Sequence, residues 1–460
     1  MPSPFHGIEL ASRALRAFQR GLDVTGHNMA NVNTRGYSRQ AVDFVQTDPT
    51  TFYGSRSISL GTGVSIASVN RVRDIFLDNR MIAASADQGR YATLSANLSQ
   101  VEPLFNEPGS NGISSALTAF FNAWSGLASN PNEPAARMAV QQAGDTLATR
   151  IRTAYRDLRD LQSQLNGGMS ETLTEVDRLS AQIYELNKEI RARTVAGENP
   201  GDLLDQRDLA LDNLSQLVDV SVVRKNDGTV GISMNSITLV DDVGSYAVPK
   251  TFDPTTYTVT DGTSTFRIDS GRMYGLMEAS NRVTSYMGEL DTLANSLRTE
   301  INTAHMSGTN ANGTTGIRFF NDTLTPPQNG AFDFNLSAEV RSDFRNIAAG
   351  ATGSAGDGGL ALAISQLRDQ PSSLLGSKKF TDFFSEILSG IGRDALDAKT
   401  SMETQGSIVS QIDMQRQSIS GVSIDEEMAN MLKFQRSYQA AAKALAIFDE
   451  VTEELIAMVR

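Results

Sequence analysis

A narrow apolar seam near the C-terminal end constrains this chain more than any other feature. From Phe434 onward, apolar or small side chains recur at alternating steps of four and three residues. The seam consists of Phe434, Tyr438, Ala441, Leu445, Phe448, Thr452, Leu455 and Val459. This is the a/d repeat of a coiled coil, which is narrower than the apolar face of a helix packed on a globular core. The helix that carries this seam therefore needs a partner helix.

The residues before the seam predict where its helix begins. Ser423 and Glu426 have the spacing of a capping box, so the helix should start there. Ile424, Met428 and Met431 extend the apolar stripe back to this start.

The N-terminal end offers a candidate partner. Its seam steps by three and four without a break, through Ile8, Ala11, Leu15, Phe18, Leu22, Thr25, Met29 and Val32. Ser3 and Pro4 are expected as N-cap and first helical residue. Residues 1–40 hold five arginines against two acidic residues, a net charge of +3, whereas residues 421–460 hold four basic against seven acidic residues, a net charge of −3. Opposite charge beside two apolar seams favours pairing of the ends, and the alternative is two independent helices packed on a central core.

Composition narrows the class of protein. A chain of 460 residues is too long for one core and suits several domains. Its net charge of −13 argues against nucleic acid as the main partner. The absence of cysteine excludes disulfides and thiolate metal sites. We find no membrane-spanning run and no secretory signal pattern, so export would need another route.

The middle of the chain is predicted to be mainly helical. The longest helical tract covers residues 134–193, which would make a rod of roughly 90 Å. Its apolar seam keeps the coiled-coil step, is loosened at Gly167 and Gly168, and consists of Leu147, Ile151, Ala154, Leu158, Leu161, Leu165, Val176, Leu179, Ile183, Leu186 and Ile190. Further helices are expected at 74–101 (broken by Pro103 and Pro108), 113–128, 202–217, 274–306, 360–369, 377–399 and 402–418. A tract as long as 134–193 is typical of architecture rather than of an enzyme core.

In residues 218–270, the spacing of the apolar side chains changes from the period of a helix to the alternation of a strand. Turns at Asn226–Gly228 and Asp261–Gly262 predict two hairpins in a small β domain inserted between helices. Residues 38–70 are expected to form an extended connector or a small hairpin.

No catalytic constellation emerges from the sequence, and we expect neither an enzyme nor a cofactor or metal site. The three histidines, His6, His27 and His305, are far apart and lack metal-binding spacing. His305 follows a helical run and is expected at the surface or as a helix cap. The glycines from Gly350 to Gly359 lack the lysine of a phosphate loop and indicate a flexible linker.

Four stretches resemble a known family. The run from Gly21 to Gln40, with Asn28, Asn31, Asn33, Gly36 and Tyr37, resembles the N-terminal signature of bacterial flagellar axial proteins. The stretches 202–222, 301–305 and 418–428 resemble the hook-associated protein 1 (FlgK) family. The similarity spans the chain in the same order.

This resemblance implies an extracellular structural subunit of the hook–filament junction. About eleven copies would form a ring between the hook protein and the second junction protein, with the two ends of each chain paired as a coiled coil along the central channel. The subunit would leave the cell through the flagellar type III apparatus after a chaperone releases its C-terminal helix. The alternatives are another axial protein, such as a hook or distal-rod subunit, and an axial protein with hydrolase activity.

The predicted fold is mainly α with an inserted β domain, in flagellin-like nested, discontinuous domains. Residues 1–73 with 421–460 would form the terminal coiled-coil domain, and 74–217 with 271–308 and 350–420 a helical rod domain. Residues 218–270 would form the outer β domain, and 309–349 a loop-rich, reduced second insertion. The seams and the signature together predict an assembly interface formed by Leu15, Phe18, Leu22, Asn28, Asn31, Asn33, Gly36, Tyr37, Met428, Met431, Phe434, Tyr438, Leu445, Phe448 and Leu455.

Overall fold

The computed structural model describes residues 5–52, 58–105, 107, 109, 112–322, 330–352, 354 and 356–458. It is mainly helical with small antiparallel sheets, which confirms the predicted fold class. The expected N-cap at Ser3 and Pro4, the break at Pro108 and the last seam residue, Val459, lie outside the described residues.

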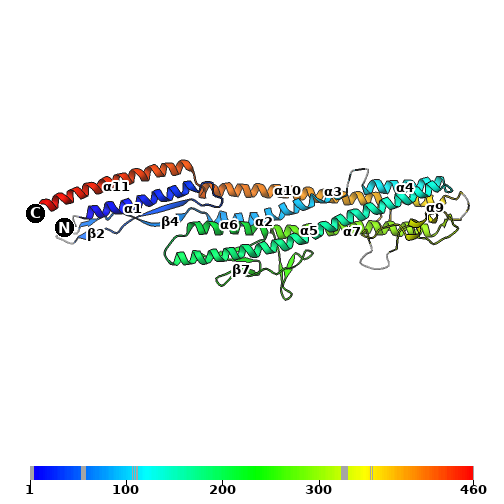
Figure 1. Cartoon of the computed structure of the whole chain (residues 1–460), viewed down its shortest axis with the longest axis horizontal. Coiled ribbons are helices and arrows are strands. Elements are labelled where there is room, and N and C mark those ends of the chain that lie inside the picture. The colour runs from blue at the N-terminus through cyan, green and yellow to red at the C-terminus, as the bar shows by residue number, and fades with distance from the viewer. Residues whose placement is uncertain are drawn as a thin grey trace. The chain divides into compact units, whose positions relative to one another are not determined.

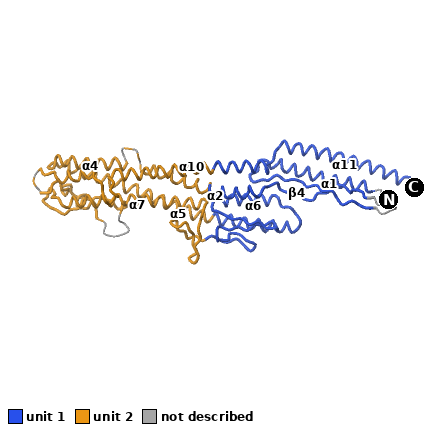
Figure 2. Tube along the Cα trace, turned by 180° about the vertical axis from the view of Figure 1, so that it is seen from behind, with its two compact units in different colours: residues 1–87, 175–248, 406–460 blue, residues 88–174, 249–405 orange. Residues whose placement is uncertain are grey.

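The chain divides into two compact units, each made of segments far apart in sequence (Figure 2). The first unit contains residues 1–87, 175–248 and 406–460, and the second contains residues 88–174 and 249–405. The predicted domain boundaries stay predictions, because this division follows compactness alone.

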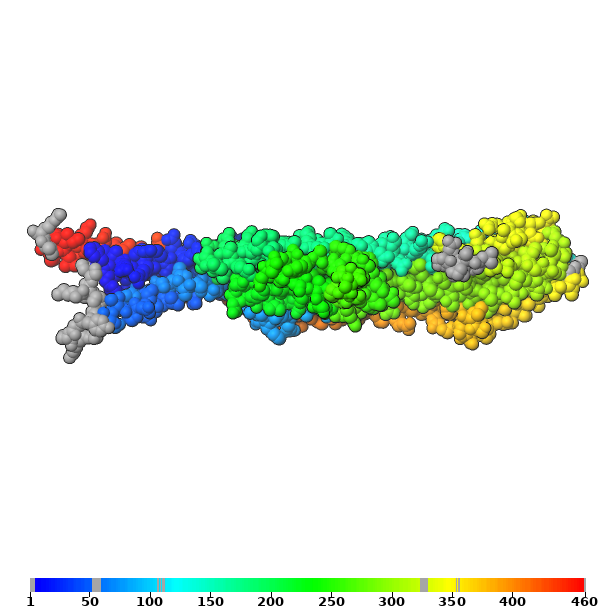
Figure 3. Space-filling view, turned by 90° about the horizontal axis from the view of Figure 1, so that it is seen from below, coloured from blue at the N-terminus to red at the C-terminus, as the bar shows by residue number. Residues whose placement is uncertain are grey.

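In the first unit, the two ends of the chain pair as helices. Helix α1 (His6–Ala30) and helix α11 (Ile424–Met458) lie side by side, shown in dark blue and red (Figure 1; Figure 3). Strand β1 (Gln40–Gln46) runs antiparallel to β4 (Val64–Arg71), and β2 (Thr50–Phe52) pairs with β3 (Ile58–Leu60). Pairing of the ends and the hairpin alternative for residues 38–70 are thus confirmed.

The helices after this hairpin differ from the prediction at two points. Helix α2 (Ile75–Leu98) ends before α3 (Val101–Leu104), and Pro103 lies within α3, whose first turn needs no proline N–H. The two helices predicted at 377–399 and 402–418 are one helix, α10 (Phe380–Ser420). No glycine or proline stands between residues 393 and 405, so nothing local ends the helix there.

Helix α5 (Pro134–Val195) runs unbroken through Gly167 and Gly168, and α6 (Gly201–Leu217) follows it. The predicted seam of α5 is almost wholly shielded from solvent, as shown by Leu147, Ile151, Leu158, Leu165, Val176, Ile183 and Ile190. An apolar side chain at every third or fourth position thus supplies the buried face along the whole helix.

Residues 218–270 form two three-stranded antiparallel sheets rather than one. The first has the order β5 (Ser221–Arg224), β6 (Val230–Met234) and β7 (Ile237–Val240). The second has the order β10 (Thr265–Arg267), β9 (Thr258–Thr260) and β8 (Thr251–Asp253). Both predicted hairpins are confirmed, since β5 pairs with β6 across Gly228 and β9 with β10 across Gly262, two glycines with positive φ. The two sheets fall in different compact units.

The second unit is built around aromatic side chains. Helix α4 (Ile113–Ser129) places Trp124 and Phe120 against Phe319, with ring centroids 5.3 and 5.7 Å apart. Helix α7 (Gly271–Met306) and helix α9 (Gly359–Gln366) belong to the same unit, as do the short elements between them. These are β11 (Thr309–Asn310), α8 (Ala338–Ser342), η1 (Phe344–Asn346) and β12 (Ala348–Gly350), and η2 (Ser373–Leu375) follows α9. The loop-rich segment predicted at 309–349 thus carries buried phenylalanines of the core.

The surface position predicted for His305 is wrong. The side chain is almost completely buried, 6.1 Å from the Trp124 ring between centroids. Its Nδ1 lies 2.7 Å from the Ile317 carbonyl oxygen, and its Nε2 accepts from the Ala348 N–H at 2.9 Å. Both polar atoms are therefore satisfied internally, which helical spacing alone did not reveal.

Candidate assembly interface

Gly7, Gly21 and Asn28 are separated by multiples of seven residues on α1, and their contacts define the register of α1 against α11. A Cβ atom added at Gly7 would lie 2.6 Å from the Phe448 ring, and one at Gly21 would lie 3.1 Å from the Phe434 ring. The Asn28 side chain donates to Glu427 Oε2 at 3.1 Å. In all three pairs the two residue numbers sum to the same value, so the helices run antiparallel in one register. Small residues on α1 thus make room for phenylalanine rings of α11.

Strand β1 adds a third layer to this contact. The Phe44 ring lies between Phe18 and Phe434, with ring centroids 6.3 and 5.7 Å away. Aromatic pairs at these separations stabilise their contact beyond the area that they bury. Phe18 and Phe434 are therefore linked through the strand that follows the N-terminal signature.

Asn28 is the polar centre of the interface, with only 1% of its surface exposed. Its amide group donates to the Gln40 carbonyl oxygen at 2.8 Å and accepts from the Gln40 N–H at 2.9 Å. The Tyr37 hydroxyl donates to the same Asn28 oxygen at 2.8 Å. Asn28 therefore holds the end of α1, the first residue of β1 and the start of α11 together.

Glu427 brings a carboxylate into this buried place. Glu427 has a second partner besides Asn28, because Arg39 Nε lies 3.5 Å from Glu427 Oε1. The same arginine donates through Nη1 to the neighbouring Glu426 at 2.9 Å. The Arg39 N–H also donates to the Ser420 carbonyl oxygen at 2.9 Å. The predicted capping box is present in one half, because Ser423 Oγ accepts from the Glu426 N–H at 3.5 Å while the Glu426 carboxylate accepts from Arg39.

The remaining signature residues shape the turn after α1. Asn31 closes the helix through its N–H and side-chain bonds to the His27 carbonyl oxygen. Gly36 has a φ of +84°, and a Cβ there would lie 3.2 Å from the Leu209 side chain, so glycine is required. Burial, then the charges of Asp202, Asp205 and Glu427, raise the pKa of Tyr37, which stays a neutral donor. Asn33 is exposed.

The other predicted interface residues divide by exposure. Half-buried side chains are Leu15, Phe18, Leu22, Met431, Phe434 and Leu445. Exposed side chains are Met428, Tyr438, Phe448 and Leu455. Within one chain, α1 thus leaves much of the apolar surface of α11 uncovered. The role of these residues in assembly stays a prediction.

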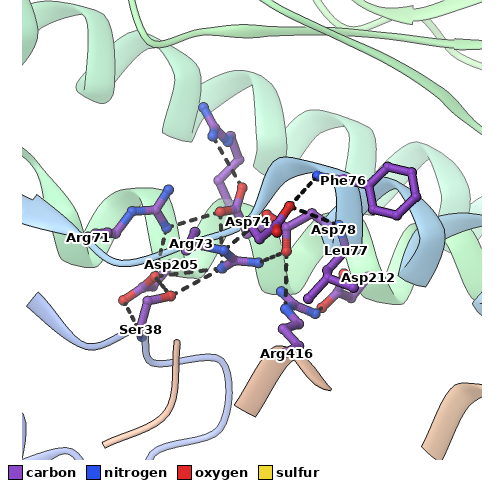
Figure 4. Close-up of polar contacts among 12 residues, drawn as sticks. Ser38, Arg71, Arg73, Asp74, Phe76, Leu77, Asp78, Asp205, Asp212 and Arg416 are labelled. Carbon is purple, nitrogen blue, oxygen red and sulfur yellow. Dashed lines mark hydrogen bonds and ion pairs between the residues drawn. The ribbon is translucent and has the colours of Figure 1, made fainter. Parts of the chain in front are cut away.

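A group of charged residues that the sequence did not reveal lies next to this interface (Figure 4). This Asp–Arg cluster consists of Arg71, Arg73, Asp78, Asp205, Arg207, Asp208, Asp212, Arg224 and Arg416. Ser38 joins it, since its N–H and hydroxyl donate to Asp205 at 3.0 and 2.7 Å. Arg416 near the end of α10 contacts Asp78 on α2 at 3.1 Å and Asp212 on α6 at 2.8 Å. The cluster therefore ties the signature loop to three helices.

Asp208 is the most strongly perturbed carboxylate of the cluster. Burial alone would raise its pKa, but the charges of Arg207, Arg71, Arg73 and Arg224 outweigh burial and lower the pKa to about 2. Arg71 Nη1 and Arg73 Nη1 lie 3.0 and 3.2 Å from Asp208 Oδ2. Removing Asp208 from this buried network would be costly, because it would leave the buried Arg207 charged and without a carboxylate partner.

Among the described residues, no group of three or more histidine, cysteine, aspartate or glutamate side chains is arranged to hold a metal ion. No helix in the described ranges combines the length and the apolarity that crossing a bilayer requires.

Comparison with known proteins identifies the class. The family model for the flagella basal body rod protein matches residues 8–37, and the model for the C-terminal region of the flagellar basal body rod FlgEFG proteins matches residues 409–458. These two matches cover most of α1 and all of α11, so the paired ends define a structural axial protein of the bacterial flagellum.

The matches over the rest of the chain define the family. The model for the helical domain of flagellar hook-associated protein FlgK matches residues 98–320. Flagellar hook-associated protein 1 of Bacillus subtilis is 32% identical over 99% of this chain and 98% of its own length. The Escherichia coli protein of the same name is 27% identical over 98% and 99%. The chain belongs to the flagellar hook-associated protein 1 (FlgK) family.

A solved structure supports the fold. The flagellar hook junction protein FlgK from Burkholderia pseudomallei superimposes with a TM-score of 0.64 at 18% sequence identity. The match covers 74% of this chain and all of the solved chain.

Proposed function

We propose that this chain is a structural subunit of the junction between the flagellar hook and filament. The observation that carries the proposal is the antiparallel pairing of the chain's two ends, locked by the buried contact between Asn28 and Glu427. Membership of the hook-associated protein 1 family supports it. In the assembled junction, the pairing would join the two ends of each subunit.

The partners follow from this role. Copies of the chain would form a ring of about eleven subunits, with the hook protein on one side and the second junction protein on the other. A cytoplasmic chaperone would hold α11 before export through the type III apparatus. The exposed apolar side chains of α11 are suited to such contacts, and in its C-terminal half they are Ile447, Phe448, Val451, Leu455, Ile456 and Met458.

Assembly would order the two ends. Each end alone offers a narrow seam, and isolated helices gain little stability in water. We therefore expect α1 and α11 to be weakly protected in the free subunit and to become ordered when neighbours cover them. Strong hydrogen-exchange protection of residues 8–32 and 424–458 in the monomer would contradict this coupling.

A charge in the seam tests the proposal. Leu445→Asp and Leu15→Asp would each place a carboxylate in an apolar contact, at a cost of several kcal/mol per subunit (roughly 2–5). Cells that make either variant should shed filament subunits into the medium and lose motility. In wild-type cells, the protein should be located at the boundary between hook and filament. Leu445→Asp should also weaken chaperone binding, whereas Leu15→Asp should not.

The control is Gln19→Asp, which places the same carboxylate at an exposed position of α1 outside the predicted interface and should leave motility intact. Label along the hook or in the rod would instead support another axial protein, and motile cells with both seam variants would sink the proposal.

A further inference from the structure

The start of helix α2 exposes two large apolar side chains in succession. Ile75 is 58% and Phe76 is 67% exposed, and the Arg80 guanidinium carbon lies 5.7 Å from the Phe76 ring centroid. We call Ile75, Phe76 and Arg80 the α2 knob. Exposed neighbours of this size on an ordered helix typically mark a contact surface.

The α2 knob stands on the most heavily paired part of the first unit. Asp74 caps the helix by accepting from the Phe76 and Leu77 N–H groups at 2.8 and 3.3 Å. One turn on, Asp78 is held by Arg73 at 2.6 Å and by Arg416 at 3.1 Å. Figure 4 shows the Phe76 ring pointing away from this network. The Asp–Arg cluster thus fixes an apolar side chain in an outward position, which costs little entropy on binding.

A concave surface of matching character lies elsewhere on the same unit. The α5–β7 groove has a volume of about 420 Å³ and is lined by Tyr184, Lys188, Arg191, Ala192, Val195 and Asp241. Apolar surface comes from Tyr184 and from Val195, which is 80% exposed, and long side chains such as Lys188 and Arg191 can add their aliphatic stems.

Charge matches shape at the edge of this groove. The Asp241 carboxylate accepts from the Val243 N–H at 2.7 Å, the Gly244 N–H at 3.0 Å and the Tyr246 hydroxyl at 3.0 Å, which are all neutral donors. Among the described residues, neither Asp241 nor Arg80 makes an ion pair within 4 Å. An aromatic knob beside a cation and an apolar groove beside a carboxylate are therefore complementary.

We propose that the α2 knob of one subunit docks in the α5–β7 groove of a second copy of the chain. The proposal rests on the proposed function, because a ring of identical subunits needs two different, complementary patches on every copy. Knob and groove supply such a pair, and repetition of the contact around the ring would leave neither patch exposed.

Cysteine cross-linking tests this contact without interference, because the natural chain has no cysteine. Phe76→Cys and Ala192→Cys are made in separate full-length chains, one carrying a mass tag, and both are expressed in the same flagellated cells. Oxidation of isolated flagella should give the mixed disulfide in several-fold excess over either homodimer. The matched control replaces Ala192→Cys by Ser125→Cys, an exposed position on α4, and should give no excess.

A second variant, without a cysteine, tests the same contact if the introduced cysteines disturb assembly. Phe76→Asp should leave the thermal unfolding of the monomer unchanged, since the ring is largely exposed, and should abolish stable junctions. Motile cells with Phe76→Asp, or equal yields of mixed and control disulfides, would overturn the contact. If the knob contact is overturned but the wild-type protein is located at the hook–filament junction, the proposed function stands. If the wild-type protein is not located there, the proposed function itself fails.

Discussion

Replacing His305 should remove a pH dependence from the stability of the second unit. The Ala348 N–H points at Nε2, so Nε2 must be unprotonated and the proton must lie on Nδ1, which donates to Ile317. A second proton would have to sit on Nε2, where its N–H would face the Ala348 N–H, and two buried donors would then meet without an acceptor. Burial lowers the pKa of His305 from 6.5 to about 4, and Arg137 adds to the effect.

The sign of the effect follows from proton counting. Between pH 6.5 and about 4 the unfolded chain binds a proton at this residue and the folded chain does not, so stability falls as the pH falls through this window. Above pH 6.5 the contribution is constant. A difference of about 2.5 pKa units corresponds to about 3 kcal/mol at the acidic end.

Urea unfolding at several pH values measures this contribution. His305→Gln keeps one donor and one acceptor but does not titrate. The measured quantity is the difference in the free energy of unfolding between the wild type and His305→Gln, from which the contributions of all other titrating groups cancel. This difference should fall by up to about 3 kcal/mol from pH 7 to pH 4. Ser125→Ala, at an exposed position that carries no titrating group, is the control and should give a constant difference. A constant difference for His305→Gln would refute the buried, neutral tautomer.

Two further substitutions test the region around the signature. Asp208→Ala should destabilise the first unit by about 3–5 kcal/mol, because it leaves the buried Arg207 without its carboxylate partner, whereas Asp48→Ala should change little; urea unfolding at pH 7 measures both. Since the pKa of Asp208 is lowered to about 2, its stabilisation is present above pH 3.8 and should be lost as the pH falls toward 2. Gly36→Ala should cost about 1–3 kcal/mol through its positive φ and the nearby Leu209, while Gly61→Ala, which faces open space, should be neutral by the same assay.

Features carried by local periodicity could be predicted from the sequence. The seam of α5, the hairpins at Gly228 and Gly262 and the start of α11 at Ser423 each depend on a few neighbouring residues. Pairing of the ends was an open alternative, because a seam indicates that a partner is needed but not which one. The register became visible only when Gly7 and Gly21 were found against phenylalanine rings, one position away from the predicted seam at Ile8 and Leu22.

Features that depend on tertiary contacts could not be predicted. Asp205 and Asp208 belong to a stretch that resembles the family, yet arginines that pair with them come from the distant positions 71, 73 and 224. Likewise, the burial of His305 depends on Ala348, which is far along the chain. Spacing within one segment carries no information about such partners.

The central claim is that the two ends of one chain pair antiparallel in a single register. The pairs Gly7–Phe448 and Gly21–Phe434 place Ala14 opposite Ala441, midway between them. In flagella built from the double variant Ala14→Cys with Ala441→Cys, oxidation should give a disulfide within one chain, and Ala14→Cys with Ser437→Cys, one helical turn away, should not. Equal yields from both variants, or disulfides mainly between chains, would contradict this register.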